Sequence, residues 1–118
     1  NQALSSRFKQ TYMLNDPNKE DFINILMKSG SYDKKICSWV YNAYDKIISF
    51  LKSPAISADD IALTVTLRGC IGALENMDEG EAPKEAIKNT LIGKIAEADL
   101  ELADKVYAEL KSLPDISF

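Results

Sequence analysis

The stretch SYDKKICSWVYNAYDKIISFLKSP, residues 31–54, carries the clearest helical pattern in the chain. Its apolar residues recur at steps of three and four, the spacing that places side chains on one face of an α-helix. Pro54 ends the pattern, because proline lacks an amide N–H and disfavours helical geometry in the residue before it. The stripe that we expect to face the core consists of Cys37, Val40, Tyr41, Tyr44, Ile48 and Leu51.

The sequence N-terminal to this stretch predicts two more helices. The first ends near Leu14, because apolar residues recur every four positions before it. The second covers about 17–28, with Asp16 capping its free amides and with Ser29 and Gly30 ending it. The repeating residues of the first helix are Leu4, Phe8 and Tyr12.

On the C-terminal side we expect two helices as well. One covers about 58–76 and begins at SADD, residues 57–60, where the Ser57 hydroxyl would cap the first turn. The other covers about 83–112, because apolar residues keep the helical spacing over that whole range. Gly93 is the position where we expect this long helix to kink.

Two glycines, Gly69 and Gly72, lie inside the helix predicted over 58–76. A glycine in a helix costs roughly 1 kcal/mol relative to alanine. Close packing against a neighbouring helix would compensate for this cost. A crevice for a ligand is the other interpretation.

These patterns predict the all-α class. Nowhere do apolar and polar residues alternate over five positions between turn residues, as they would in a strand. The chain has 118 residues, 46% of them apolar and 27% charged, which is typical of one globular domain covering 1–118. Short connections favour antiparallel neighbours. We therefore expect a compact bundle of about five helices, mostly antiparallel, with the long C-terminal helix as its spine.

The residues that most often carry catalysis or hold a cofactor are missing from the sequence. It has no histidine, which removes the commonest general base and every imidazole metal ligand. Its two cysteines cannot form a four-thiolate zinc site, and its five glycines form no phosphate-binding loop. We predict a protein that is not an enzyme and that binds no cofactor or metal.

Charge divides the chain into two unlike halves. Residues 1–53 carry eight basic and five acidic side chains, whereas residues 54–118 carry six and thirteen. This balance argues against nucleic-acid binding, which needs a concentrated basic face. The acidic half would attract a basic protein partner, and the alternative is that its acidic surface only keeps the protein in solution. No apolar run approaches the roughly 20 residues that span a bilayer. The acidic residues that we assign to partner binding are Asp78, Glu79, Glu81 and Glu85.

Trp39 is the only tryptophan, and it lies beside the predicted core stripe rather than on it. One interpretation is that it packs in the core or against the first helix. The other is that it is exposed and binds a partner, a role in which tryptophan is enriched.

The two cysteines would lie at similar levels of an antiparallel hairpin that turns near Ala55. Cys37 lies eighteen residues before that turn and Cys70 fifteen after it, an offset of about 4.5 Å along a helix. A disulfide is therefore possible, and the alternative is two buried free thiols. Free thiols would indicate a cytoplasmic protein and a bridge an exported or periplasmic one. The chain begins at Asn1 rather than Met, and a removed signal peptide is one explanation.

Three functions stay open at this point. The first is a non-catalytic protein-binding module, such as an inhibitor of the immunity type that occludes a partner protein. The second is a structural protein in which copies of the chain assemble into a larger helical bundle. The third, with less in its favour, is a helical regulator associated with DNA.

Overall fold

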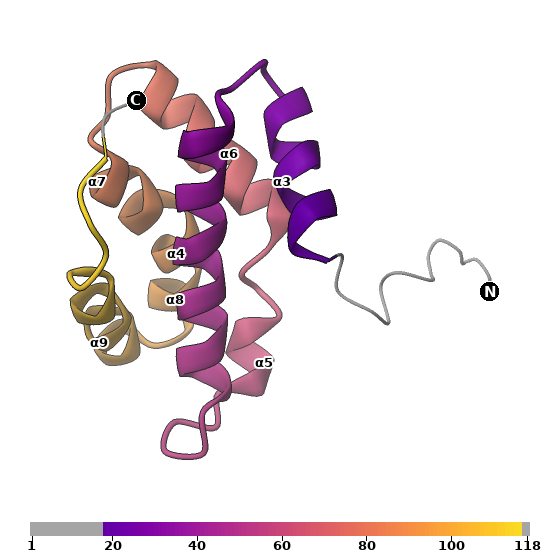
Figure 1. Ribbon diagram of the computed structural model, residues 1–118. Helices are drawn as coiled ribbons and strands as arrows, with labels where there is room; N and C mark the ends of the chain where they lie inside the picture. Colours follow the sequence, from indigo (N-terminus) through magenta and orange to yellow (C-terminus); the bar gives the residue numbers. More distant parts are fainter. Residues whose placement is uncertain (1–17, 117–118) are drawn as a thin grey trace.

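The computed structural model describes residues 18–116, and the regular secondary structure in that range is entirely helical (Figure 1). The all-α prediction is thereby confirmed, while the helix predicted to end near Leu14 lies outside the described residues. The elements are α3 (Lys19–Lys28), α4 (Lys34–Lys52), α5 (Asp59–Ala62), α6 (Leu67–Asp78), α7 (Pro83–Ile87), the π-helical turn η1 (Lys88–Ile92), α8 (Gly93–Ala98) and α9 (Leu100–Leu110).

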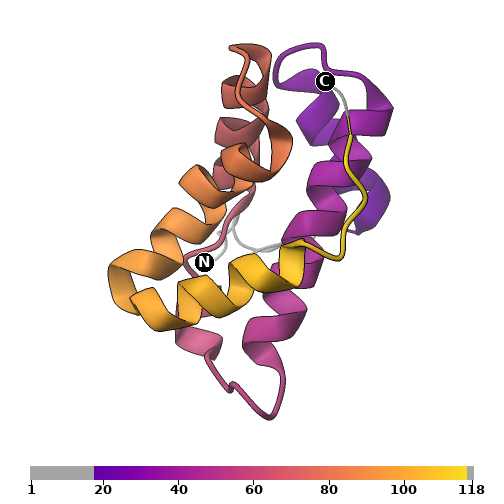
Figure 2. The ribbon, with the colours of Figure 1, turned by 90° about the vertical axis from the view of Figure 1, so that its left-hand side faces the viewer.

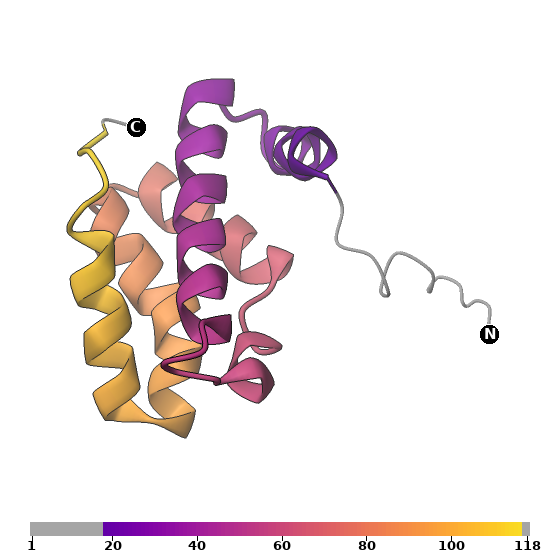
Figure 3. The ribbon, with the colours of Figure 1, turned by 60° about the horizontal axis from the view of Figure 1, so that its bottom comes forward.

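The centre of the bundle is α4, which contacts α3, α5, α6 and α9 (Figures 1 and 3). Because neighbours lie on several sides of it, its buried face is wider than the predicted stripe. Tyr41, Tyr44 and Ile48 were expected in the core but are only partly buried. The two tyrosine rings pack on Phe22 of α3, with ring centroids 5.1 and 4.8 Å apart. The residues of α4 that are buried are Ile36, Cys37, Trp39, Val40, Ala43, Ile47 and Leu51.

The start of α3 differs from the prediction by two residues. The cap is Asn18, whose side-chain oxygen accepts a hydrogen bond from the Asp21 amide at 2.9 Å. Such a bond satisfies one of the amides that lack a partner in the first turn. The helix ends at Ser29 as expected.

The prediction of a single helix over 58–76 is wrong, because the helix is interrupted between α5 and α6. The Ser57 hydroxyl does not cap α5 but donates to the Pro54 carbonyl at 3.1 Å, and Ala58 precedes the helix without a side-chain cap. Thr66 caps the start of α6, since its hydroxyl oxygen accepts a hydrogen bond from the Gly69 amide at 3.3 Å. A β-branched residue with a hydroxyl favours this cap over the helix interior.

Replacing Thr66 with alanine should therefore lower the free energy of unfolding by about 1 kcal/mol, the usual cost of losing such a cap. Chemical denaturation measures the change. Thr66→Ser keeps the hydroxyl and should stay close to the parent chain. Equal losses in the two variants would show that the cap does not stabilise α6.

The prediction of one continuous helix over 83–112 is also wrong. The chain is helical from Pro83 to Ala98 but turns sharply at Asp99, whose backbone is extended (φ −160°, ψ 99°). The Asp99 carboxylate accepts a hydrogen bond from the Leu102 amide at 3.0 Å and so caps α9. As a result α9 doubles back beside α8 and packs on α4 (Figure 2).

The irregularity expected at Gly93 lies one turn earlier, in the π-helical turn η1. The widened turn places two consecutive residues, Leu91 and Ile92, in the core. The Thr90 hydroxyl donates to the Ala86 carbonyl at 2.7 Å and so supplies this turn with a side-chain hydrogen bond.

Close packing is the observed reason for one of the two helix glycines. A Cβ atom built on Gly69 would lie 2.6 Å from Cδ2 of Leu91, so α6 and η1 meet there without room for a side chain. At Gly72 the nearest atom, Cγ2 of Thr90, is 3.6 Å away, an ordinary contact. The packing interpretation therefore holds at Gly69, where the neighbour is a side chain.

Candidate functional site

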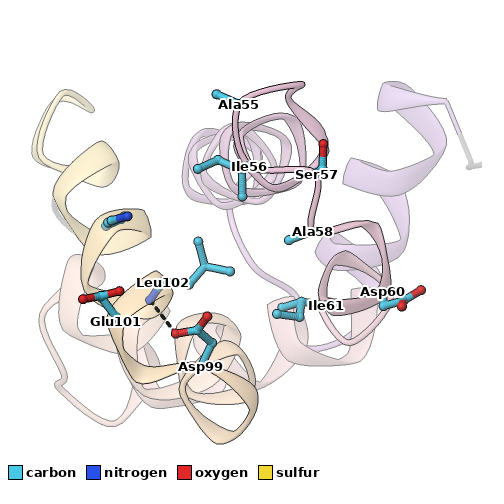
Figure 4. A pocket seen from close by; sticks show the side chains of 10 residues that line it. Ala55, Ile56, Ser57, Ala58, Asp60, Ile61, Asp99, Glu101 and Leu102 are labelled. Atoms are coloured by element: carbon cyan, nitrogen blue, oxygen red, sulfur yellow. Dashed lines mark hydrogen bonds between the residues drawn. The ribbon is translucent and has the colours of Figure 1, made fainter.

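A hollow of about 490 Å³ opens at the end of the bundle where α4 stops and α9 begins. Three segments that are distant in the sequence form it: the loop 55–58, α5, and the first turns of α9 (Figure 4). Its size lies in the range of ligand-binding clefts in proteins. Its larger side chains are Ile56, Asp60, Ile61, Asp99, Glu101, Leu102 and Lys105.

The floor of the hollow is apolar. The side chains of Ile56, Ile61 and Leu102 point toward one another from the three segments (Figure 4). Ile56 is held there by the tight loop after α4, in which the Ala58 amide donates to the Leu51 carbonyl at 2.7 Å and Ser57 adopts a left-handed backbone (φ +50°). Few non-glycine residues adopt that conformation, so this turn is a specific feature of the loop.

The rim of the hollow is acidic. Asp99 lies at its edge and is fixed by its hydrogen bond to the Leu102 amide, whereas Asp60 and Glu101 lie at opposite sides with their carboxylates directed away from the apolar floor (Figure 4). Lys105 is the one basic residue of the lining. Within residues 18–116 Lys84 and Asp115 form an ion pair, and none of the rim carboxylates is paired with a lysine or arginine of that range.

This combination suits a ligand that is aliphatic along its length and positively charged at its end. Lysine and arginine side chains have that form, because their methylene groups pack on apolar surface while the charged end stays in water. The described residues also contain no cluster of histidine, cysteine or carboxylate side chains suited to a metal ion. The hollow therefore offers groups for binding a cationic side chain.

The four acidic residues predicted to bind a partner lie at the other end of the bundle, around the turn from α6 to α7 (Figure 1). Asp78 and Glu79 are exposed there, just before Gly80, whose φ of +108° makes the turn. The Glu81 carboxylate accepts from the Asn89 amide group at 2.6 Å and is partly buried. The structure therefore does not bring this acidic turn together with the hollow.

The fourth acidic residue, Glu85, accepts a hydrogen bond from the Tyr107 hydroxyl at 2.9 Å and links α7 to α9. This hydrogen bond, together with burial, raises the pKa of Tyr107. Burial also raises the pKa of Tyr32, and the nearby carboxylates of Asp78 and Glu75 add to that shift. The acidic turn is therefore negatively charged, but two of its four predicted carboxylates already bind groups of the same chain.

Trp39 is buried, with 5% of its surface exposed, so its assignment to the core is confirmed and the exposed interpretation is wrong for this conformation. Its indole N–H donates to the Pro114 carbonyl at 2.8 Å. The group that covers it is thus the C-terminal segment, a contact over 75 positions that helical spacing does not predict. A role of Trp39 in binding a partner stays a prediction.

Cys37 and Cys70 are free thiols in the structure, and both are buried, the first in α4 and the second in α6. Burial raises the pKa of Cys37 from 9.0 to about 11, and the Asp33 carboxylate adds to that shift. Burial raises the pKa of Cys70 as well. Both thiols are therefore protonated at neutral pH, which makes them poor nucleophiles.

The sequence analysis did not identify the residues of the hollow. Ile56 and Ile61 carry no motif, and Leu102 was assigned to the middle of a continuous helix. The acidic composition of residues 54–118 was the one signal that pointed toward them. In the part of the chain that the structure describes, no helix has the length and apolar character needed to cross a bilayer. No protein-family model, curated protein or solved structure matches this chain.

Proposed function

We propose that the protein is a non-catalytic binding module that docks a basic segment of another protein in the hollow between α5 and α9. The observation that carries this proposal is the aliphatic floor bordered by three carboxylates that form no ion pair with any basic residue of the described range 18–116. A partner side chain with a long aliphatic stem and a positive end would bury its stem on Ile61 and Leu102. Its charge would meet the acidic rim that Asp60, Asp99 and Glu101 form.

The excess of acidic groups in residues 54–118 supports a role in the encounter as well as in the final contact. Opposite charge on two surfaces accelerates association, and salt weakens this effect because it shortens the distance over which charges act. Bound in this way, the domain would cover a basic surface of its partner. That action is the one expected of an inhibitor of the immunity type.

Selection from a displayed library of random peptides on the immobilised full chain tests the proposal without a known partner. We expect the enriched peptides to combine lysine or arginine with an aliphatic neighbour. Asp60→Lys/Glu101→Lys should weaken the binding of these peptides by about tenfold, because two attractive rim charges become repulsive. Affinities come from fluorescence anisotropy of a labelled peptide.

A matched pair of reversals at exposed positions outside the lining of the hollow, Glu20→Lys/Asp45→Lys, is the control, since it changes the net charge by the same amount. Only the rim variant should lose affinity at physiological salt. Equal losses in the two variants would show that net charge alone attracts the peptides. Enrichment of peptides without basic residues would contradict the assignment of the hollow.

Assembly of identical chains is a second candidate function, and two exposed side chains favour it. Leu63 is 77% exposed and Leu100 is 68% exposed, and they follow α5 and begin α9, the two helices that border the hollow. Large apolar side chains exposed to water would be buried if copies of the chain met at these two helices. Light scattering that gives a monomer at high protein concentration would remove this candidate.

A further inference from the structure

The C-terminal segment 113–116 runs as an extended strap beside α4 after the end of α9 (Figure 2). It reaches the indole of Trp39 through the Pro114 carbonyl at 2.8 Å. One residue further on, the Asp115 carboxylate lies 3.1 Å from Nζ of Lys84. Ile116 is partly buried against the core. The strap thus closes a groove whose walls are Trp39 and residues 82–84.

The strap is held by few contacts. The Asp115 side chain is 93% exposed, so water and salt screen its pair with Lys84. Within the described residues, no backbone hydrogen bond holds the amides of Asp115 and Ile116, and Pro114 has no amide N–H to donate. A segment with so few backbone bonds opens locally at low cost. Opening would expose Trp39, a residue type enriched where proteins bind one another.

The groove is also incompletely filled. A cavity of about 230 Å³ remains between the strap and its walls, beside Trp39, Pro83 and Ile116. A larger apolar side chain in the place of Ile116 would fill it and gain contacts that the chain's own residue lacks. The fit of the strap therefore shows what the groove accepts and where a better occupant would differ.

From these contacts we infer that the groove is a second docking site, independent of the hollow. It binds an extended partner segment in which a carboxylate precedes a large apolar residue. Three features of the groove recognise that segment: the indole N–H takes a backbone carbonyl, Lys84 takes the carboxylate, and the cavity takes the apolar side chain. In the free protein, residues 113–116 occupy the groove and compete with the partner.

The test uses full-length protein and the fluorescence of its only tryptophan. Ile116→Asp removes the apolar contact of the strap, so the emission of Trp39 should shift to the red and be quenched more strongly by acrylamide. Leu100→Asp makes the same chemical change at an exposed position and should leave both properties unchanged. Unchanged emission and quenching in the Ile116→Asp protein would contradict the inference that residues 113–116 cover Trp39.

Binding is then measured with a synthetic five-residue peptide, residues 112–116 with phenylalanine in place of Ile116. Added to the Ile116→Asp protein, it should reverse the shift in a saturable way. A second peptide that also has lysine in place of Asp115 should bind at least about threefold more weakly. Lys84→Glu in the same protein should invert that preference. Equal binding of the two peptides, or no binding of either, would overturn the assignment.

The strap should also compete with the peptide in the parent chain. If the groove is open in about a tenth of the molecules, the peptide binds the parent chain about tenfold more weakly than the Ile116→Asp variant. Equal affinities would show that the strap does not compete. Should Ile116→Asp lose its helical circular dichroism, Asp115→Lys replaces it, because that side chain is exposed and its exchange leaves the core intact. The reversals at Asp60 and Glu101 should not affect these measurements. The proposal for the hollow and the proposal for the groove are therefore tested independently.

Discussion

Replacing Leu91 with alanine should lower the free energy of unfolding by about 2–5 kcal/mol, the range for a buried leucine whose site cannot collapse. Leu91 is 1% exposed, and its Cδ2 fills the space left by the missing side chain of Gly69. Because α6 meets η1 at this point, the substitution opens a cavity between two parts of the core. The midpoint of thermal unfolding should fall by about 10 °C or more.

The matched control is Leu100→Ala, the same chemical change in a neighbouring helix at a position that is 68% exposed. It should change the free energy of unfolding by no more than about 0.5 kcal/mol. Urea denaturation of both variants gives the comparison. A loss below 1 kcal/mol at Leu91, on the order of a surface change, would contradict the contact between η1 and α6.

Raising the pH from 8 to 10 should destabilise the reduced protein by about 2.7 kcal/mol, through the two buried thiols. Burial raises the pKa of Cys37 from 9.0 to about 11 and raises that of Cys70 too. Above pH 9 the unfolded chain releases these protons while the folded chain keeps them. The unfolded state therefore binds fewer protons, and the free energy of unfolding falls by about 1.4 kcal/mol per pH unit for each thiol. Below pH 9 this contribution to stability is fully present.

Denaturation at several pH values, in the presence of a reductant, measures this slope. Cys37→Ala/Cys70→Ala should be less stable at pH 8 but should lose less stability on going to pH 10. The pKa values of Tyr32 and Tyr107 are also raised, so both tyrosines add to the slope in the parent chain and in the double variant alike, and the difference between the two slopes reports on the thiols. Identical slopes in the parent chain and the double variant would contradict buried, protonated thiols. Protein prepared without reductant that shows no thiol slope would instead support the bridge between Cys37 and Cys70.

The sequence predicted the all-α class and the two helices around which it is built, α3 and α4, because local signals mark their ends. Pro54 forbids continuation of α4, and Ser29 with Gly30 ends α3. Spacing at three and four residues located these helices but not the width of their buried faces. Trp39 and Ile47 are buried because α4 has neighbours on several sides, which one amphipathic stripe does not reveal.

The turn at Asp99 could not be predicted from the same pattern. Both α8 and α9 are amphipathic, and the apolar spacing continues across the turn without a glycine or a proline. What breaks the helix is tertiary: by folding back, the chain buries Leu102, Val106 and Leu110 in the core that α4 centres. Tertiary burial overrides local helix propensity when the free energy gained by burying apolar area exceeds the cost of interrupting the helix.

The candidate site was missed for the same reason. The hollow joins residues 55–61 to residues 99–105, and the groove at Trp39 joins α4 to the last described residues of the chain. Each of these residues is unremarkable within its own segment. Their proximity follows from the turn at Asp99, which redirects α9 and therefore sets where the chain ends.

The π-helical turn bears on how this sequence would compare with a related one. A π turn holds one more residue than an α turn, so it accommodates an insertion without forming a loop. Removing one residue between Lys88 and Ile92 would return this turn to α-helical geometry and leave the helix before and after it facing the same neighbours. A relative without the extra residue would therefore keep the partners of both Ile87 and Ile95. Aligned with this chain, it would show a gap inside a helix rather than in a connection.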